Sequence, residues 1–488
     1  MTARYAVIAG GAPSSVSGLT DHLAHETLKP EQAALAAYYQ HGGAAHDQIG
    51  IVRQDCHPIV MRGLGLDDGE RLTNKRIDGI MSGHTAQGEK IEGKTYSVRR
   101  GAPNHTGSIV FSPAPHKSVS VAWGLAPPVE QAMIYNAHVT AARDYMAFVA
   151  TALGQIRVGK GGEDGRVPGH VGWVEFTHHT SRRTATVIRD GGVHFEKIEA
   201  AGDMDLHTHF VVPATTWAED GRVGSLDTKC LSLDFCLAAD AVYHAAISRE
   251  LRAAGLGVEL DETRGPVGAA RVTSVPQEMA DVFSKRTNAG LALARMTAKA
   301  RGEDWDSLSA EQIATRVHNA TQDKRQKSLG GKDDVANVAD WQRQCKDVGW
   351  DIPQTFLAPE HERAVDVTHE QRIRKAYEIA LPSLDLQFQQ RAVISAWDLH
   401  RAASAGLTAA GYRDLSDVDA VVDLMRREGV LHDGQKTRLI EGQEPDRRYR
   451  SVTTLLHEAQ ERDFVALAKS AAADRSLAAT PEQVDRAA

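Results

Sequence analysis

Apolar residues recur along this chain with two different spacings, which predict strands in some segments and helices in others. Short apolar runs typical of β-strands lie at residues 5–9, 172–176 and 206–212, and on both sides of residues 113–117. Helical spacing predicts helices over residues 31–40, 128–153, 234–254, 276–302 and 309–326. The two kinds of element together predict a mixed α+β protein.

The last part of the chain has a pattern of its own. Helical spacing over residues 391–405 and 416–428 is followed by two short apolar runs that flank Asp433-Gly434. Because Asp-Gly between apolar runs is typical of a tight hairpin turn, the order is helix, helix, hairpin. This order predicts a small winged-helix-like module near residues 385–455.

With 488 residues, the chain is long enough for two or three domains. Its composition, 42% hydrophobic and 25% charged residues, is that of an ordinary globular protein. No apolar run approaches the roughly 20 residues of a membrane span, and residues 1–4 are not followed by the apolar segment of a signal peptide, so neither feature is expected. The four cysteines show no Cys-x-x-Cys spacing, which favours reduced thiols and a cytoplasmic protein.

The net charge of −8 argues mildly against a nucleic-acid partner, because phosphate binding depends on lysine and arginine. A basic groove can nevertheless lie on an acidic protein. Clusters at residues 99–100, 182–183 and 324–327 could line such a groove, although each alone is more often a solvated surface. Charge therefore leaves the partner open.

The most informative chemistry lies in the run D-M-D-L-H-T-H-F-V-V at residues 203–212. On a strand, His207 and His209 would project from the same face with Cβ atoms about 7 Å apart. A third imidazole from a neighbouring strand, at His178 or His179, would complete a nitrogen-donor site for a divalent metal with positions open to substrate. The alternative is a pair of hydrogen-bonded histidines on a half-buried strand.

Four blocks of this sequence resemble the MobF-type conjugative relaxases (the TrwC/TraI group), in the order of that family. They are A-A-Y-Y-Q-H-G-G at residues 36–43, I-V-F-S-P-A-P-H-K-S-V-S-V at 109–121, F-T-H-H-T-S-R at 176–182 and D-M-D-L-H-T-H at 203–209. The resemblance extends over about residues 30–460. It selects His178 over His179 and implies a metal site of His178, His207 and His209.

The resemblance also implies a tyrosine nucleophile and residues that contact DNA. Tyr38 aligns with the first tyrosine of the family, and a phenol becomes a usable nucleophile when a cation or base stabilises its phenolate. Tyr39 would pack or stack on a base, while Lys117 and Arg182 would contact phosphates. His116, next to Lys117, is expected to be an exposed turn residue.

The chain departs from the family pattern at three places. The second tyrosine pair of many members is absent, with His46 at its position. Ser108 stands where the family has an aspartate that orients a metal-bound histidine or accepts a proton, and Glu175, Asp205 and Asp227 are unranked candidates to replace it. Residues 183–202 form an insertion whose alternating pattern around Asp190-Gly191 predicts a β-hairpin.

Residues 88–95, G-E-K-I-E-G-K-T, match the phosphate-binding loop of nucleotide hydrolases. That motif requires a buried strand before it and a helix after it, and the flanking residues here are polar and glycine-rich. We therefore interpret the match as accidental. No nucleotide is expected to bind, and the helicase motor of the large family members is not expected in this chain.

The resemblance implies a fold in which a central antiparallel sheet of the HUH-endonuclease type carries the histidines. We expect a catalytic core at residues 1–268, a helical region that clamps DNA at 269–357, and the winged-helix-like module and tail at 358–488. The implied activity is metal-dependent nicking of single-stranded DNA at a plasmid origin of transfer, through a 5′-phosphotyrosyl intermediate. Mg²⁺ or Mn²⁺ is the expected metal, with Zn²⁺ as the alternative, and relaxosome accessory and coupling proteins are the expected partners.

Two other classes remain open from the sequence. Amidohydrolase-type metal hydrolases also begin with Asp-x-His-x-His on a strand, but they need eight β/α units after it, and this chain turns mainly helical. The second class is a DNA-binding protein that keeps the relaxase fold with weak catalysis, as Ser108 and the single tyrosine pair would allow.

Overall fold

The computed structural model describes most of the chain from residue 50 onward, together with one strand before it. The described residues are 5–9, 50–52, 56–67, 71–94, 96, 98–99, 102–103, 105–159, 163–181, 184–189, 192–197, 202–228, 231–263, 267–308, 310–322, 335–359, 367–442 and 451–473.

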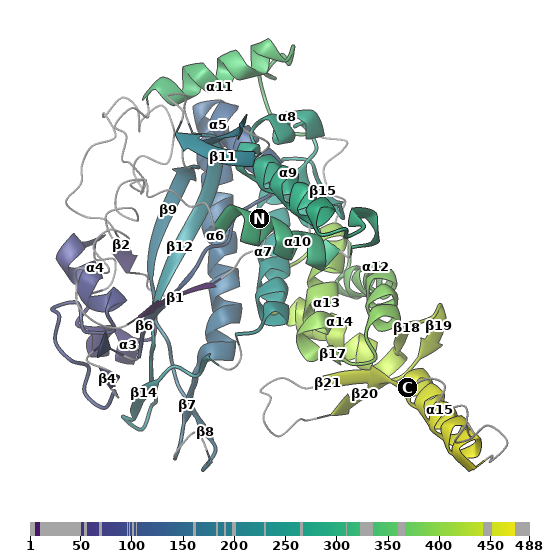
Figure 1. Ribbon diagram of the computed structural model, residues 1–488. Coiled ribbons are helices and arrows are strands. Elements are labelled where there is room, and N and C mark those ends of the chain that lie inside the picture. The colour runs from purple at the N-terminus through teal and green to yellow at the C-terminus, as the bar shows by residue number, and fades with distance from the viewer. Residues whose placement is uncertain are drawn as a thin grey trace.

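A six-stranded antiparallel sheet forms the centre of the protein (Figure 1). Its strands, in spatial order, are β1 (Tyr5–Ala9), β6 (Thr106–Phe111), β12 (Met204–Pro213), β9 (Val174–Thr180), β2 (Gly50–Val52) and β3 (Arg71–Leu72). Every neighbouring pair is antiparallel. The predicted α+β fold with a central antiparallel sheet is thus confirmed, and the two histidine segments lie on adjacent central strands.

Three helices cover one face of this sheet: α5 (Lys117–Leu125), α6 (Pro128–Leu153) and α7 (Leu233–Ala253). Figure 1 shows α6 running along β12, with α7 packed beside α6. Aromatic rings join the layers, because Tyr145 of α6 packs against Phe111 of β6 and Phe210 of β12. The long helix that the apolar spacing predicts over 128–153 has the predicted bounds, with Pro128 in its first turn.

His116 is not the exposed turn residue that the sequence suggests. Its side chain is buried and accepts a hydrogen bond from the Ser118 amide, which caps the N-terminus of α5. The His116 Nε2 atom lies 3.5 Å from an Asp261 carboxylate oxygen. A residue before a helix can satisfy the free amides of the first turn, and here that role keeps the imidazole inside.

Short antiparallel hairpins and two small helices surround the sheet. The inserted hairpin is present as predicted, with β10 (Thr184–Arg189) paired to β11 (Gly192–Lys197). The other elements before residue 275 are α3 (Pro58–Leu64), α4 (Asn74–Met81), β4 (Val98–Arg99), β5 (Ala102–Pro103), β7 (Gln155–Arg157), β8 (Arg166–Pro168), β13 (Thr215–Trp217), β14 (Val223–Ser225), β15 (Val258–Asp261) and β16 (Ala269–Val272).

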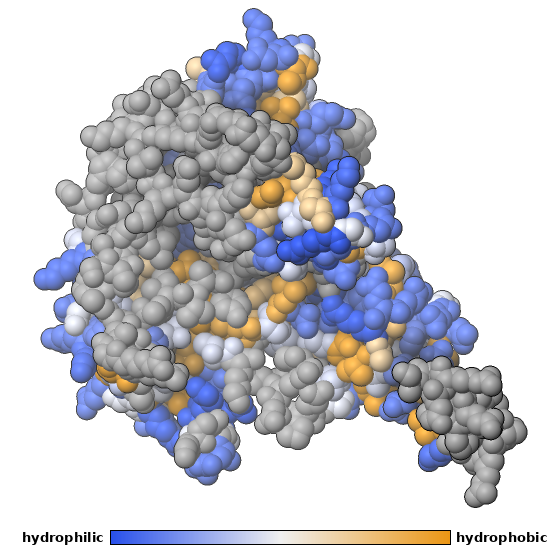
Figure 2. All heavy atoms as spheres, in the orientation of Figure 1, coloured by the Kyte–Doolittle hydropathy of each residue, from blue (hydrophilic) through white to orange (hydrophobic). Residues whose placement is uncertain are grey.

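Between residues 277 and 347 the described residues are mainly helical, and they contact the residues just before β12. They form α8 (Gln277–Val282), α9 (Lys285–Ala300), the 3-10 turn η5 (Trp305–Ser307), α10 (Ala310–Gln322) and α11 (Val335–Asp347). Lys285 forms an ion pair with buried Asp203, and the Trp341 indole donates to the Gly202 carbonyl at 2.9 Å. Figure 2 shows hydrophilic side chains over α11, interspersed with apolar ones. The region is helical as predicted, and its clamping role stays a prediction.

The C-terminal part contains both predicted helices and a hairpin that turns at Asp433-Gly434. The second strand of this hairpin is Gln435–Thr437, and the apolar run at residues 439–440, which was expected to form it, pairs with Ser451–Thr454 instead. The elements of this part are α12 (His369–Gln390), β17 (Ile394–Ser395), α13 (Ala396–Ala410), α14 (Leu415–Glu428), β18 (Val430–His432), β19 (Gln435–Thr437), β20 (Leu439–Gly442), β21 (Ser451–Thr454) and α15 (Leu455–Ala473). Asp433 has positive φ, as the tight β18–β19 turn requires. The winged-helix classification and the boundary at residue 358 stay predictions.

This C-terminal part shares the hydrophobic core of the region around the central sheet. Helix α13 packs against α7, and the Trp397 ring of α13 lies 5.2 Å from Phe235 of α7 and 5.6 Å from Phe148 of α6, between centroids. The Ser248 hydroxyl of α7 donates to the Thr408 carbonyl of α13 at 2.8 Å. The two parts therefore stabilise each other.

Trp397→Ala should lower the free energy of unfolding of the whole chain by about 3 kcal/mol, because it leaves a cavity between three helices. Urea denaturation followed by circular dichroism measures this change. Leu386→Ala is the control, since its side chain is 56% exposed and its loss should cost less than about 0.5 kcal/mol. Equal effects of the two substitutions would contradict the shared core.

None of the helices among the described residues is both long and apolar enough to cross a membrane.

Candidate metal centre

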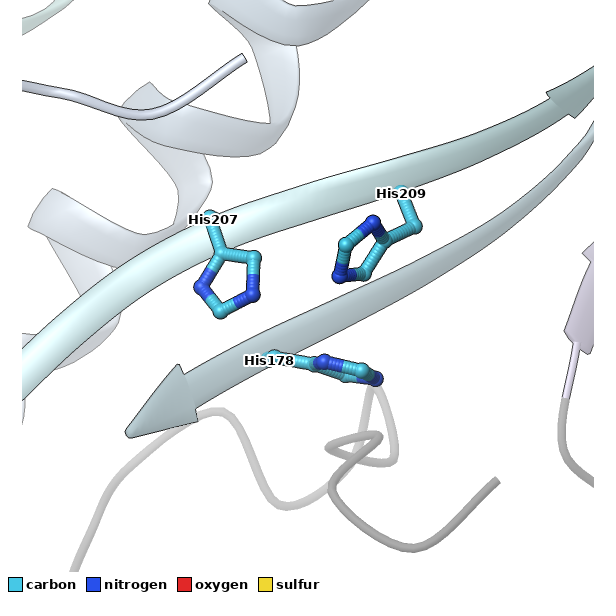
Figure 3. A group of neighbouring side chains, drawn as sticks. All are labelled: His178, His207 and His209. Carbon is cyan, nitrogen blue, oxygen red and sulfur yellow. The ribbon is translucent and has the colours of Figure 1, made fainter. Parts of the chain in front are cut away.

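The structure brings the three predicted histidines together on one face of the sheet. His207 of β12 lies opposite His178 of β9, and His209 lies opposite Phe176. Residues opposite each other on paired strands share a face, as do residues two apart on one strand. All three imidazoles therefore project from the face away from α6, toward one another (Figure 3).

The geometry suits a single divalent ion. The ring centroid of His178 lies 5.2 Å from that of His207 and 4.8 Å from that of His209. The centroids of His207 and His209 are 4.9 Å apart. One ligand atom from each ring lies within 4.8 Å of the others. His178 is buried, whereas His207 and His209 are partly exposed, so solvent reaches part of the cluster. Three protein nitrogens with an open side are typical of a catalytic metal site.

Hydrogen bonds fix how two of the rings present their nitrogens. His207 Nδ1 lies 2.7 Å from the Asp205 carbonyl oxygen, which can only accept, so Nδ1 carries the proton and Nε2 keeps its lone pair. His209 Nδ1 lies 2.6 Å from the Ser112 hydroxyl. Second partners of this kind orient imidazole ligands, and here a carbonyl and a hydroxyl supply them.

The three carboxylates proposed to replace the aspartate missing at Ser108 lie in different places. Glu175 pairs with Phe210 and so lies on the helix-covered face, and Asp227 is 3.2 Å from the Arg166 guanidinium. Asp205 is near the site, with a carboxylate oxygen 3.9 Å from His207 Nδ1. Ser108 itself is buried and donates to the Met81 carbonyl, opposite Pro213. Among these candidates, Asp205 alone lies beside a histidine of the site.

Lys117 is held at the same strand. Its Nζ donates to the Met204 carbonyl at 2.7 Å and to an Asp205 carboxylate oxygen at 2.8 Å. Burial by itself would raise the pKa of Asp205, but the Lys117 ammonium and the His207 ring outweigh it and lower that pKa below its ordinary value. The Asp205 carboxylate therefore stays charged beside the histidines. The phosphate contact that the resemblance implies for Lys117 stays a prediction.

A buried polar network lies directly behind the histidines, on the other face of the sheet. The Thr208 hydroxyl, between His207 and His209 in sequence, lies 3.0 Å from the Thr177 hydroxyl and 2.8 Å from His138 Nε2. His138 Nδ1 in turn lies 2.7 Å from the Tyr243 hydroxyl. Burial, with a smaller effect of His207, lowers the pKa of His138 to about 3, so its ring is neutral.

This network favours the register that places the histidines together. A slip of one residue would turn Thr208 away from His138 and send His207 and His209 to the opposite face. Sequence reasoning missed Ser112, His138 and Tyr243. Thr208, enclosed within the His-x-His motif, was the available signal, because alternation places it on the buried face. No sequence signal pairs it with His138, which lies 70 positions earlier.

Thr208→Val should therefore weaken both folding and metal binding. The substitution keeps the shape but leaves His138 without one buried hydrogen bond, at a cost of about 1–3 kcal/mol. Calorimetric titration with Mn²⁺ should give a lower affinity, and urea denaturation should give a lower stability. Thr215→Val is the control, because among the described residues the buried Thr215 hydroxyl has no hydrogen-bond partner. If Thr208→Val binds Mn²⁺ as tightly as Thr215→Val and is equally stable, the proposed role of the network is contradicted.

The other predicted site residues are placed as follows. Tyr38, Tyr39 and Arg182 lie outside the described residues. His179 projects to the helix-covered face, where its ring lies 5.8 Å from Trp123 of α5. The strand register therefore agrees with the choice of His178 over His179.

The segment that matches a phosphate-binding loop is not arranged as one. It follows helix α4 rather than a strand, and β4 follows it. Lys94 is buried, and its Nζ donates to the Thr106 carbonyl at 3.5 Å. Burial lowers the pKa of Lys94 to about 8. The lysine is thus directed into the protein.

An antiparallel sheet that carries three converging imidazoles is the arrangement that the sequence resemblance predicts, and comparison with known proteins defines the family. The model of the TrwC relaxase family matches residues 19–348, more than half of the chain. This protein therefore belongs to the TrwC relaxase family. Among curated proteins, no sequence matches it.

Solved structures of similar fold agree with this assignment. One, described as the conjugative relaxase TrwC in complex with oriT DNA in a metal-bound state, is 20% identical with a TM-score of 0.50. A second, a copper-bound complex of TrwC with oriT DNA, is 22% identical with a TM-score of 0.50. Each alignment covers 72% of this chain and 100% of the other. At these identities the likeness is one of fold.

Proposed function

We propose that this protein is a conjugative DNA relaxase that cuts and rejoins one strand of DNA at a plasmid origin of transfer. Membership of the TrwC relaxase family supports this function. The observation that carries it is the convergence of His178, His207 and His209 on one open face of the sheet. Relaxosome accessory and coupling proteins would be its partners in transfer.

The three histidines would hold a divalent metal ion. Their donors are all nitrogen, and the protonated Nδ1 of His207 leaves its Nε2 available as a ligand. Imidazole nitrogens suit Zn²⁺, and water molecules in the remaining coordination positions would supply the oxygen ligands that Mn²⁺ and Mg²⁺ prefer. When bound, the ion would stabilise negative charge that develops on the oxygens of the scissile phosphate.

Tyr38 would act as the nucleophile. Its phenol oxygen would form a bond to phosphorus while the bond from phosphorus to the 3′-oxygen breaks, and the phenolic proton would pass to that 3′-oxygen through solvent or a base. The products are a 5′-phosphotyrosyl link and a free 3′-hydroxyl. Because the phosphoester is retained, attack by the 3′-hydroxyl can reverse the cut. Tyr39, Lys117 and Arg182 would contact the DNA.

The first alternative class disagrees with the sheet. Amidohydrolases build their metal site in a barrel of eight parallel strands, whereas every pair of neighbouring strands in the central sheet is antiparallel. The second alternative, a weakly catalytic DNA-binding protein of the same fold, differs from an active relaxase in its chemistry alone.

An adduct assay separates the classes. The protein is incubated with Mn²⁺ and end-labelled single-stranded DNA containing an origin of transfer, then analysed on a denaturing gel. A relaxase gives a metal-dependent covalent protein–DNA band and a shortened strand with a free 3′-hydroxyl. Binding without an adduct would instead identify a DNA-binding protein, and cut DNA without linked protein would identify a hydrolase.

A further inference from the structure

A second group of metal-ligating side chains lies outside the histidine site. His57 precedes α3, His170 lies between β8 and β9, and Glu219 lies in the turn between β13 and β14. One Glu219 carboxylate oxygen is 3.0 Å from His170 Nε2 and 3.3 Å from His57 Nε2. The two imidazole rings are stacked, with centroids 3.8 Å apart and an angle of 6° between their planes.

We infer that His57, His170 and Glu219 form a second metal site, which takes a borderline transition-metal ion such as Zn²⁺. Two imidazole nitrogens and one carboxylate oxygen are a common donor set for Zn²⁺, and these ligand atoms lie within 4.8 Å of one another. Both histidine side chains are 36% exposed and Glu219 is 71% exposed. Water can therefore fill the remaining coordination positions.

The two sites are separate. His170 precedes β9, whereas His178 lies in the second half of that strand. No side chain is shared between them, so a substitution in one leaves the donors of the other unchanged. The second site therefore does not rest on the proposed DNA chemistry.

The local hydrogen bonds allow these rings to become ligands. His57 Nδ1 accepts a hydrogen bond of 3.4 Å from the Ile59 amide, so in the present arrangement its proton is on Nε2. Coordination through Nε2 would require that proton to move to Nδ1, and the long Ile59 contact that this tautomer gives up is a weak bond to lose. Stacked rings cannot both aim their lone pairs at one ion, so one ring must rotate, which its exposed side permits.

A bound ion would connect three segments that are distant in the sequence. His170 already forms two backbone hydrogen bonds with Trp217, of 2.7 and 3.0 Å, which hold the approach to β9 against β13. Coordination would add the N-terminus of α3 and the β13–β14 turn to this contact. Because the ligands are brought together by folding, the ion would bind the folded chain and raise its melting temperature.

Zn²⁺ titration of the full chain, with calorimetry for stoichiometry and thermal unfolding for stability, tests the inference. Wild-type protein should bind two equivalents. Glu219→Ala and His170→Ala should each bind one, and the rise in melting temperature with Zn²⁺ should be smaller than in the wild type. Asp220→Ala, which removes the adjacent exposed carboxylate, is the matched control and should bind two.

His209→Ala separates the two sites. It should bind one equivalent, and the double variant His209→Ala with Glu219→Ala should bind none. If His170→Ala fails to fold, Glu219→Ala keeps the test, because its side chain lies on an exposed turn. Two results would overturn the second site. In one, the wild type binds a single equivalent of Zn²⁺ and His209→Ala binds none. In the other, Glu219→Ala still binds two equivalents with unchanged affinities. If the wild type instead binds one equivalent, which Glu219→Ala abolishes and His209→Ala retains, the second site stands and the result counts against the proposed function.

Discussion

Tyr38→Phe is expected to abolish the covalent protein–DNA adduct while folding and DNA affinity survive. The substitution removes one oxygen and little volume, so the strand would still bind but no atom would attack the phosphorus. Loss of a nucleophile typically costs several orders of magnitude in rate, on the order of 10⁴–10⁶-fold. The measurement is the yield of adduct on a denaturing gel, with filter binding of the same DNA as the measure of affinity.

Tyr39→Phe is the matched control and should form the adduct at a level similar to the wild type. Successive residues near a helix end differ in direction by about 100°, so the two phenols of a helical pair cannot both face the metal. Mass spectrometry of the DNA-linked peptide identifies the nucleophile directly. A label on Tyr39, Tyr5 or Tyr96 would show that the assignment of Tyr38 is wrong.

His209→Ala, and equally His207→Ala, should remove metal from the triad and abolish DNA cleavage without unfolding the protein. Each variant loses one of three nitrogen donors, and the two that remain cannot hold a catalytic ion at micromolar concentration. Both side chains are partly exposed, so removing either ring disturbs little of the hydrophobic core. Calorimetric titration with Mn²⁺ measures the binding, and the adduct assay measures the cleavage.

His179→Ala is the informative control for this prediction. Its ring is buried against Trp123 on the opposite face, so its loss should lower stability by about 1–3 kcal/mol while metal stoichiometry is retained. Wild-type Mn²⁺ affinity in both His207→Ala and His209→Ala would refute the triad. Loss of metal in His179→Ala at a temperature where that variant is folded would point to another register.

The sequence predicts the histidine triad well because the information is local. Alternation along a strand places His207 and His209 on one face, and the structure adds the expected partner strand with His178 opposite His207. The surrounding hydrogen bonds are different. Ser112 reaches His209 only because β6 pairs with β12 in one particular register, and pairing between distant strands is not encoded in the spacing of either strand.

The packing of helices could not be predicted from periodicity either. Residues 276–302 show one continuous helical pattern, yet the chain breaks it into α8 and α9 at Ser284, whose hydroxyl turns back to the Ala280 carbonyl. Helices α13 and α14 correspond to predicted helices, but the sequence analysis predicts neither α12 nor the contact of Trp397 with Phe148 and Phe235. An apolar stripe indicates that one face of a helix is buried, but it does not identify the element that packs against this face.

In the glycine- and polar-rich segment at residues 56–94, the structure contains helices that the sequence does not predict. The sequence shows no helical spacing there, but α3 and α4 form, and they bury residues such as Val60, Leu64 and Ile80. Helices this short are marginal by themselves and depend on tertiary packing. These helices contain too few apolar residues to show a helical spacing in the sequence. Their contacts with the core are therefore visible only in the structure.

The position of β12 has a consequence for how the site behaves in time. This strand has a hydrogen-bonded neighbour on each side, β6 and β9, and its inward side chains lie in the core. Amides in such a strand exchange with solvent only through the largest and rarest openings of a protein. An ion that arrives at His207 and His209 therefore meets ligands whose backbone is already ordered, so little conformational entropy is lost on binding. Incoming DNA would have to adapt to this strand, since the strand itself is among the last parts of the molecule to move.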